Sequence, residues 1–187
     1  MKYLIAGLGN IGEEYSGTRH NIGFTVLDAL ASASNVHFKD TRLAFSASLK
    51  YKSRIFVMIK PTTYVNLSGR AVHYWMKKEK VPADRLLVVL DDLALPFGTL
   101  RLRPHGGDGG HNGLAHINQI LGTQQYARLR FGIGNEFFHG KQVRHVLGEW
   151  TSEEEDNLAG RIKVANDIIL SFGAIGVERT MNHFNNR

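Results

Sequence analysis

The chain has 187 residues, and an apolar fraction of 43% is enough for a real core and excludes global disorder. It contains no cysteine, which excludes thiol catalysis, disulfide bonds and cysteine-ligated zinc and suits a reducing cytoplasm. The net charge of +6 and the pI near 9.7 are equally compatible with a polyanionic partner and with an ordinary basic protein. We expect no signal peptide, because the apolar stretch over residues 1–9 is short and Glu13 and Glu14 soon follow. We expect no membrane helix, because no apolar run approaches the roughly 20 residues of a membrane span.

Strands and helices alternate along the first half of the chain. The predicted elements are, in order, a buried strand over residues 3–8, a glycine-punctuated loop over 9–17, a helix over 20–30, two strands over 45–51 and 55–59, and a helix over 68–80. Only Lys52-Ser53 separates the two strands, which predicts a hairpin, and Pro61 ends its second strand.

The second half continues the alternation. The predicted elements are a short buried strand over 86–90, a strand over 100–103, a glycine-rich loop over 104–113, a helix to 121, a strand over 128–133, a mobile loop over 135–141 and two C-terminal helical segments. Thr151 and Glu154 form a capping box at the first of these segments, and Gly173 is expected to interrupt it. This order predicts an α/β fold: a single three-layer α/β/α domain over residues 1–187 with a mixed, mostly parallel sheet.

Five polar residues lie where apolar strands end, beside Gly or Pro, or at the start of a predicted helix: Asn10, His20, Asn66, Asp91 and Asn112. The set contains one possible general base, one carboxylate to orient it and three amides. Such a set suits the attack of water on a carbonyl group whose surroundings carry amides. Each residue also has a structural alternative, since histidines, aspartates and asparagines commonly cap helices and turns.

Two glycine-rich segments admit other interpretations. Residues 7–12 match the dinucleotide fingerprint G-x-G-x-x-G, but Gly17 interrupts the following helix and no strand ending in an acid follows about 20 residues later. Residues 104–113 could cradle a phosphate or form a mobile lid that ends at Asn112. His105, Asp108 and His111 in this loop match no standard metal-site spacing, so we expect no metal.

Two strands are predicted to carry paired cations on one face, Arg101 with Arg103 and Arg128 with Arg130. A solvated sheet face is the simple explanation for either pair. Two such strands together favour an anion-binding patch more strongly than either strand would alone.

A series of motifs carries a resemblance to a known family. In chain order they are Gly7-Leu-Gly-Asn-Ile-Gly12, Tyr15, Thr18-Arg-His-Asn-Ile-Gly23, Lys60-Pro-Thr-Thr-Tyr-Val-Asn-Leu-Ser-Gly69, Asp91-Asp-Leu-Ala-Leu-Pro96, Gly109-Gly-His-Asn-Gly113, Arg128-Leu-Arg-Phe-Gly-Ile-Gly134 and Met181-Asn. Over essentially its whole length the chain resembles bacterial-type peptidyl-tRNA hydrolase. The resemblance implies a single α/β/α domain that is monomeric and cytoplasmic, uses no metal or nucleotide cofactor, and acts on peptidyl-tRNA.

The resemblance also implies roles for individual residues. The catalytic histidine falls on His20 and its partner carboxylate on Asp91. The remaining site residues fall on the substrate-binding Asn10, Tyr15, Tyr64, Asn66 and Asn112 and on the tRNA phosphate-binding Arg101, Arg103 and Arg130.

Three positions depart from the family pattern. Ile11 stands where proline is usual, Val65 replaces a common methionine, and the acidic pair reads Asp91-Asp92, so Asp92 is a second candidate partner for His20. Two other functions remain open from the sequence: a Rossmann-type oxidoreductase, and an RNA-binding module without catalysis.

Overall fold

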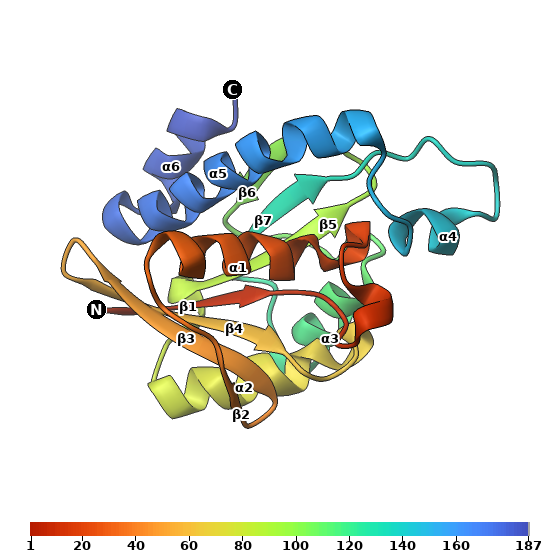
Figure 1. Ribbon diagram of the computed structural model, residues 1–187. Helices are drawn as coiled ribbons and strands as arrows, with labels where there is room; N and C mark the ends of the chain where they lie inside the picture. The colour runs from red at the N-terminus through yellow and green to blue at the C-terminus, as the bar shows by residue number, and fades with distance from the viewer. Residues whose placement is uncertain (187) are drawn as a thin grey trace.

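A single seven-stranded sheet forms the centre of the molecule in the computed structural model, which describes residues 1–186 (Figure 1). The strand order is β2-β3-β4-β1-β5-β7-β6. The strands are β1 (Lys2–Gly7), β2 (Lys39–Thr41), β3 (Ala44–Tyr51), β4 (Arg54–Pro61), β5 (Leu86–Asp92), β6 (Leu100–Arg103) and β7 (Ala127–Gly132). The central strands β4, β1, β5 and β7 pair in parallel, whereas β2, β3 and β6 each join through antiparallel pairs. The predicted mixed sheet is therefore confirmed, with parallel pairing in its centre and antiparallel pairing at both edges.

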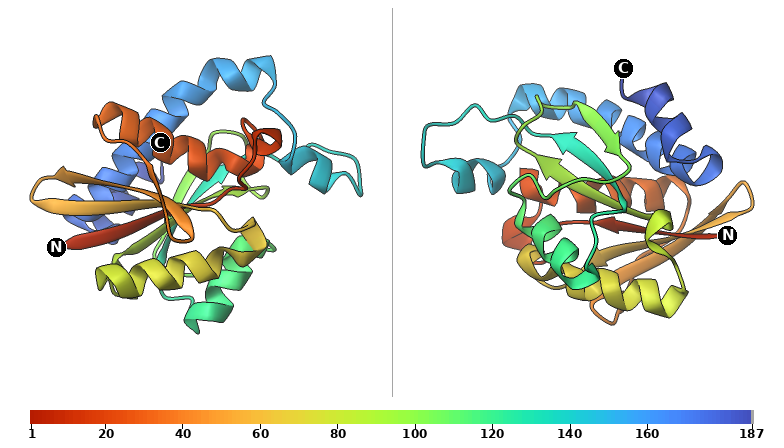
Figure 2. Two further views of the ribbon diagram at one scale, coloured as in Figure 1. Left: turned by 60° about the horizontal axis from the view of Figure 1, so that its bottom comes forward. Right: turned by 180° about the vertical axis from the view of Figure 1, so that it is seen from behind.

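Helices cover both faces of this sheet, as the predicted three-layer arrangement requires (Figures 1 and 2). They are α1 (Ile22–Ala33), α2 (Ser68–Glu79), α3 (Asn112–Leu121), α4 (Gln142–Val146), α5 (Ser152–Ile175) and α6 (Val177–Phe184). Apolar residues of α1 and α5 form one core with one face of the sheet, and those of α2 and α3 form a second core with the opposite face. Strands β1 and β5 lie between the two cores, which explains their almost uninterrupted apolar sequences.

A glycine pair presses the start of α1 against the middle of the sheet. A Cβ atom on Gly7 would lie 2.3 Å from the carbonyl oxygen of Gly23, and one on Gly23 would lie 2.6 Å from the carbonyl oxygen of Val89 in β5. Only glycine permits this approach. The first glycine of the G-x-G-x-x-G motif thus serves helix packing, and the short turn Glu13–Tyr15 follows Gly12 where a dinucleotide site needs a long helix.

Local signals gave correct boundaries at two places. Lys52 and Ser53 both adopt positive φ values, 44° and 61°, as a two-residue hairpin turn between β3 and β4 requires. At the start of α5, the Thr151 side chain accepts from the Glu154 backbone N–H and the Glu154 carboxylate accepts from the Thr151 N–H. The predicted hairpin and capping box are both confirmed.

The expected break at Gly173 is wrong. Helix α5 continues to Ile175 and stops at Gly176, whose φ of 89° is unfavourable for other residues. Gly173 is instead a packing site, because a Cβ atom there would lie 2.3 Å from Cζ of Phe56. The first long helix also begins later than predicted, since a turn of 3₁₀ helix over Arg19–Asn21 precedes α1.

The sequence did not predict β2 or the five-residue helix α4. Helix α4 follows the segment 135–141 and lies apart from the sheet at one end of the molecule (Figure 1). Within residues 1–186, no helix is long and apolar enough to span a membrane.

Candidate active site

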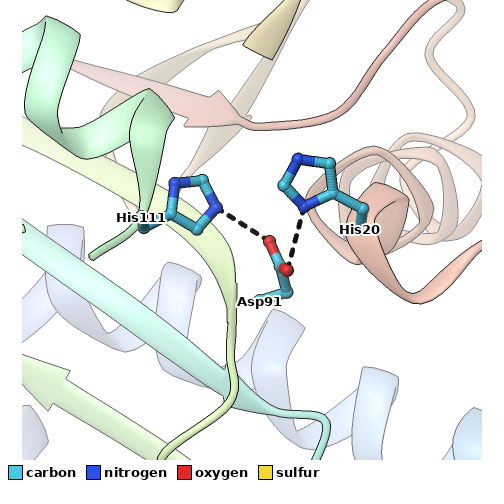
Figure 3. Close-up of side chains that lie close together, drawn as sticks. All are labelled: His20, Asp91 and His111. Atoms are coloured by element: carbon cyan, nitrogen blue, oxygen red, sulfur yellow. Dashed lines mark hydrogen bonds and ion pairs between the residues drawn. The ribbon is translucent and has the colours of Figure 1, made fainter. Parts of the chain in front are cut away.

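His20 and Asp91 meet at the carboxyl end of β5 (Figure 3). The Nδ1 atom of His20 lies 2.9 Å from Oδ2 of Asp91. Asp91 is 4% exposed, whereas His20 is only partly buried and lines an open cleft. Because Nδ1 faces a carboxylate, it carries the proton and donates to Asp91. The Nε2 atom of the neutral ring is then an unprotonated acceptor, and Figure 3 shows it on the side of the ring away from Asp91.

A second histidine, His111, binds the other oxygen of the same carboxylate. Its Nε2 atom lies 2.9 Å from Oδ1 of Asp91 (Figure 3). Its Nδ1 atom accepts from the backbone N–H groups of Gly113 and Leu114 and caps α3. Since Nδ1 is an acceptor, the proton of His111 resides on Nε2 and is donated to Asp91. Both oxygens of the carboxylate are thereby fixed.

The pKa shifts follow from this arrangement. Burial favours the neutral acid, yet His111 and His20 stabilise the carboxylate so strongly that the pKa of Asp91 is held well below its usual range. Burial alone would lower the pKa of His20, but the hydrogen bond and the charge of Asp91 outweigh it, and the pKa of His20 lies above its ordinary value of 6.5. Asp91 is therefore ionised at neutral pH, and it favours the charged form of His20.

Asn21 and Asn10 hold the loop that carries His20. The Asn21 side chain accepts from the Asn10 N–H and donates to the Asn10 carbonyl, at 2.8 Å in both cases. The Oδ1 atom of Asn10 accepts in turn from the N–H of Val65 at 2.9 Å. The loop after β1 is thus tied on one side to the turn that contains His20 and on the other to the segment between β4 and α2.

The cleft beside His20 has a volume of about 1190 Å³. Most of the predicted site residues line it: Asn10, His20, Tyr64, Asn66, Asp91, Asn112, Arg103 and Arg130. Tyr15 does not line this cleft, and Arg101 lines a different depression. Asn66 and Asn112 are exposed, and their side chains make no hydrogen bond to other described residues. Neither side chain caps a helix, so both amides are available to a ligand.

Asp92 has a different neighbour from Asp91. Its carboxylate pairs with Nε of Arg130 and accepts from the N–H of Ala94 at 2.8 Å. Adjacent residues of a strand point to opposite faces, so Asp91 and Asp92 cannot both face His20. The hydrogen-bond partner of His20 is therefore Asp91 and not Asp92.

Arg128 does not belong to an exposed basic face, contrary to the sequence-based expectation. It is 2% exposed and donates to the carbonyl groups of Gly107, Gln124 and Tyr126. The Arg128 guanidinium thus anchors the glycine-rich loop through its bond to Gly107.

Three of the site residues could also ligate a metal. Within residues 1–186, the one such group is His20, Asp91 and His111, whose ligand atoms lie within 4.8 Å of one another. Two imidazoles and a carboxylate suit a transition metal. A metal would have to displace both protons donated to Asp91. The earlier candidates His105 and Asp108 are not members of the group.

Sequence reasoning missed His111 as a partner of Asp91 and Asn21 as the clamp on Asn10. His111 was noticed only as an unconvincing metal ligand in a glycine-rich loop. Its position one residue before Asn112, at the start of a helix, was a usable signal, because an N-terminal cap fixes the ring beside the cleft. No comparable signal marked Asn21.

A histidine oriented by a buried carboxylate, with its free nitrogen facing an open cleft, can take a proton from water. The fold and site are thus compatible with a hydrolytic class of enzyme. A profile of the peptidyl-tRNA hydrolase family matches residues 4–187. The chain is 59% identical to peptidyl-tRNA hydrolase of Phocaeicola vulgatus and 57% identical to that of Bacteroides fragilis, in each case over the whole of both chains.

The fold agrees with these sequence relationships. A crystal structure of peptidyl-tRNA hydrolase from Acinetobacter baumannii superimposes with a TM-score of 0.92 at 33% identity, covering 98% of this chain and 94% of that one. The chain belongs to the peptidyl-tRNA hydrolase family and is an enzyme of that class.

Proposed function

We propose that the protein hydrolyses the ester bond of peptidyl-tRNA and releases free peptide and free tRNA, with His20 as the general base. The observation that carries the proposal is the hydrogen bond from Nδ1 of His20 to the buried carboxylate of Asp91, which leaves Nε2 as an unprotonated acceptor on a ring that lines the cleft. Family membership supports the choice of substrate.

In this mechanism Nε2 of His20 removes a proton from water as the water oxygen attacks the ester carbonyl carbon. Asp91 fixes the ring and stabilises the imidazolium that forms. The C–O bond to the terminal ribose then breaks, and the proton held by His20 passes to the departing ribose oxygen. The products are a peptide with a free carboxyl group and a free tRNA.

The amides of the cleft suit a peptide. Asn66 and Asn112 can each donate and accept without charge, and Asn10 keeps its Nδ2 group free because only its Oδ1 is used by Val65. Tyr64 is 61% exposed at the cleft and offers an aromatic surface to the substrate. Tyr15 lies outside the cleft, so its proposed substrate contact would be with a more distant part of the tRNA.

The cations of the cleft suit the tRNA. Arg103 and Arg130 line it, and cross-strand pairing places Arg101 and Arg103 opposite Arg130 and Arg128. We assign Arg103 and Arg130 to phosphate binding near the ester. The protein is proposed to act as a cytoplasmic monomer without a metal or nucleotide cofactor.

One assay tests the function directly. The purified protein should release free tRNA from N-acetylaminoacyl-tRNA much faster than from unblocked aminoacyl-tRNA. Tight binding of tRNA with no release would instead support an RNA-binding module without catalysis. Equal release from both substrates would support a general esterase.

A further inference from the structure

A second depression lies at the β6 edge of the sheet, outside the catalytic cleft. It has a volume of about 590 Å³ and shares no lining residue with the cleft. It lies between the edge strand and the C-terminal helices, and Figure 2 shows these helices beside β6. Its lining is polar and cationic: Phe97, Gly98, Thr99, Arg101, Asn157, Arg161, Asn185 and Asn186.

Arg101 and Arg161 supply the charge of this depression, from β6 and α5 respectively. Nη1 of Arg101 donates to the Leu100 carbonyl at 3.1 Å, and Nε of Arg161 donates to the Gly98 carbonyl at 2.7 Å. A guanidinium has five N–H groups, so each arginine is held in place while most of its donors remain available. No acidic residue lines the depression, and neither arginine forms a salt bridge within residues 1–186.

Asn185 fixes the wall of the depression. Its side chain accepts from the N–H of Leu102 at 2.9 Å and donates to the Leu102 carbonyl at 3.0 Å, as a neighbouring strand would. This pair of bonds ties the end of α6 to the edge strand and protects that edge from other pairing. The arginines therefore lie in a site whose walls are held by hydrogen bonds.

We propose that Arg101 and Arg161 bind a backbone phosphate of the tRNA, at a different point along the RNA from the phosphate bound by Arg103 and Arg130. This inference rests on the proposed function. Two cations that form no salt bridge within the described residues, in a depression lined by no acidic residue, suit a phosphodiester, and the asparagine amides beside them suit ribose hydroxyl groups. The expected phosphate patch is thus divided into two sites, with Arg101 in the outer one.

The test compares two substrates that differ in the RNA they carry. One is N-acetylaminoacyl-tRNA, and the other is the same N-acetylaminoacyl ester of adenosine, which has no RNA body. For the double variant Arg101→Gln/Arg161→Gln, kcat/KM for the tRNA substrate should fall about tenfold or more at low salt, through KM. The slope of log(kcat/KM) against log[salt] should become shallower by about one, because the two arginines together neutralise one phosphate. Hydrolysis of the adenosine ester should not change.

Controls separate charge from structure. Lys50→Gln removes one charge at an exposed position near the β3–β4 turn and should leave both substrates unaffected. Arg101→Lys/Arg161→Lys keeps the charge and should retain most of the salt dependence. The proposal is overturned if the Gln variant keeps a normal kcat/KM for the tRNA substrate, or if its kcat/KM falls equally for both substrates. It is also overturned if kcat/KM for the tRNA substrate falls as far in the Lys variant as in the Gln variant.

The proposed function can fail independently. If the unaltered protein releases no tRNA from N-acetylaminoacyl-tRNA, the hydrolytic function is wrong. Direct binding of uncharged tRNA then tests the arginines alone: the Gln variant should bind tRNA at least several-fold more weakly, and unchanged binding would reject the site.

Discussion

Asp91 and His111 lie 20 positions apart in the sequence, yet Nε2 of His111 is 2.9 Å from Oδ1 of Asp91. Because His20 binds the other oxygen, the two hydrogen bonds together hold the carboxylate against the His20 ring. His111 contacts no reacting atom in the proposed mechanism, so we regard it as a positioning residue. It also joins the glycine-rich loop to the end of β5.

His111→Gln tests that role. The ring donates to Asp91 and accepts from the N–H groups of the first turn of α3, and the flexible glutamine amide does not hold that geometry, which should cost about 1–3 kcal/mol of stability. The variant should also lose turnover, by less than a change at His20 itself, and the pH profile of kcat should shift. Urea unfolding and a pH series measure these effects. His105→Gln, in the same loop but exposed, is the matched control; a pH profile unmoved by His111→Gln would leave only a structural role.

His20→Ala should reduce turnover by about 10²- to 10⁴-fold, the usual contribution of a general base. Binding of tRNA should persist, because the arginines are untouched. Single-turnover rates with N-acetylaminoacyl-tRNA, together with a direct binding measurement, separate the two effects. Near-normal turnover would show that another group activates the water.

Asp91→Asn should lower the rate and move its pH dependence. The proposed mechanism uses the neutral form of His20 as the base, so kcat of the unaltered protein should rise with pH and reach its plateau above the raised pKa of His20. Without the carboxylate, burial dominates and the pKa of His20 falls, so the inflection should move to lower pH while the plateau rate drops. An inflection that stays in place or moves upward would contradict the pairing.

Asp92→Asn is the control for this experiment. It removes the partner of Arg130 and not that of His20. We expect the inflection to stay where it is and any loss to appear in the use of the full tRNA substrate. A crippling loss of kcat in this variant would show that the acidic pair was assigned in the wrong order.

Signals carried by neighbouring residues were the ones that predicted structure well. The capping box at Thr151 and the hairpin turn at Lys52-Ser53 each depend on a few consecutive residues. Asp91 was found because an apolar strand visibly ends there. The contact between His111 and Asp91 joins a loop to a distant strand, and neither periodicity nor charge encodes it.

The arginines show a second limit of prediction from the sequence. Alternation along a strand gives the face on which a side chain lies, but not what covers that face. Arg128 and Arg130 occupy the same face of β7, yet Arg128 is buried under the loop that contains Gly107 while Arg130 is partly exposed beside Asp92. Likewise Arg101 lies across from Arg130 in register but lines another depression.

Arg128→Met should destabilise the protein by about 2–4 kcal/mol, because it removes a buried guanidinium that donates to three backbone carbonyl groups. The glycine-rich loop should lose its anchor at Gly107, so hydrogen exchange of residues 105–110 should accelerate. Urea unfolding measures the free energy of unfolding, and hydrogen exchange followed by mass spectrometry measures how well the loop is protected. Arg103→Met, on the neighbouring strand but lining the cleft, should change stability far less; equal losses would show that burial of Arg128 has no special weight.

Asn10→Ala tests whether Asn10 contributes to the proposed preference for blocked over unblocked substrate. A blocked α-nitrogen is a neutral amide, whereas a free one is largely cationic below its pKa of about 8. The free Nδ2 group of Asn10 can donate to a peptide carbonyl but is mismatched to an ammonium group. The variant should therefore narrow the ratio of the two hydrolysis rates.

The same substitution also removes the acceptor for the N–H of Val65, so a purely structural role has its own signature. If Asn10 only holds its loop to Val65, the variant should lose stability and slow both substrates by the same factor. Asn10→Asp separates the two roles, because it keeps an acceptor for Val65 and replaces the amide donor by a negative charge. Under the recognition hypothesis this variant should retain thermal stability and yet favour the unblocked, cationic substrate more than the unaltered protein does. If the Asp variant keeps the original ratio, Asn10 does not contact the substrate nitrogen or its neighbouring carbonyl, and its contribution is to the loop alone.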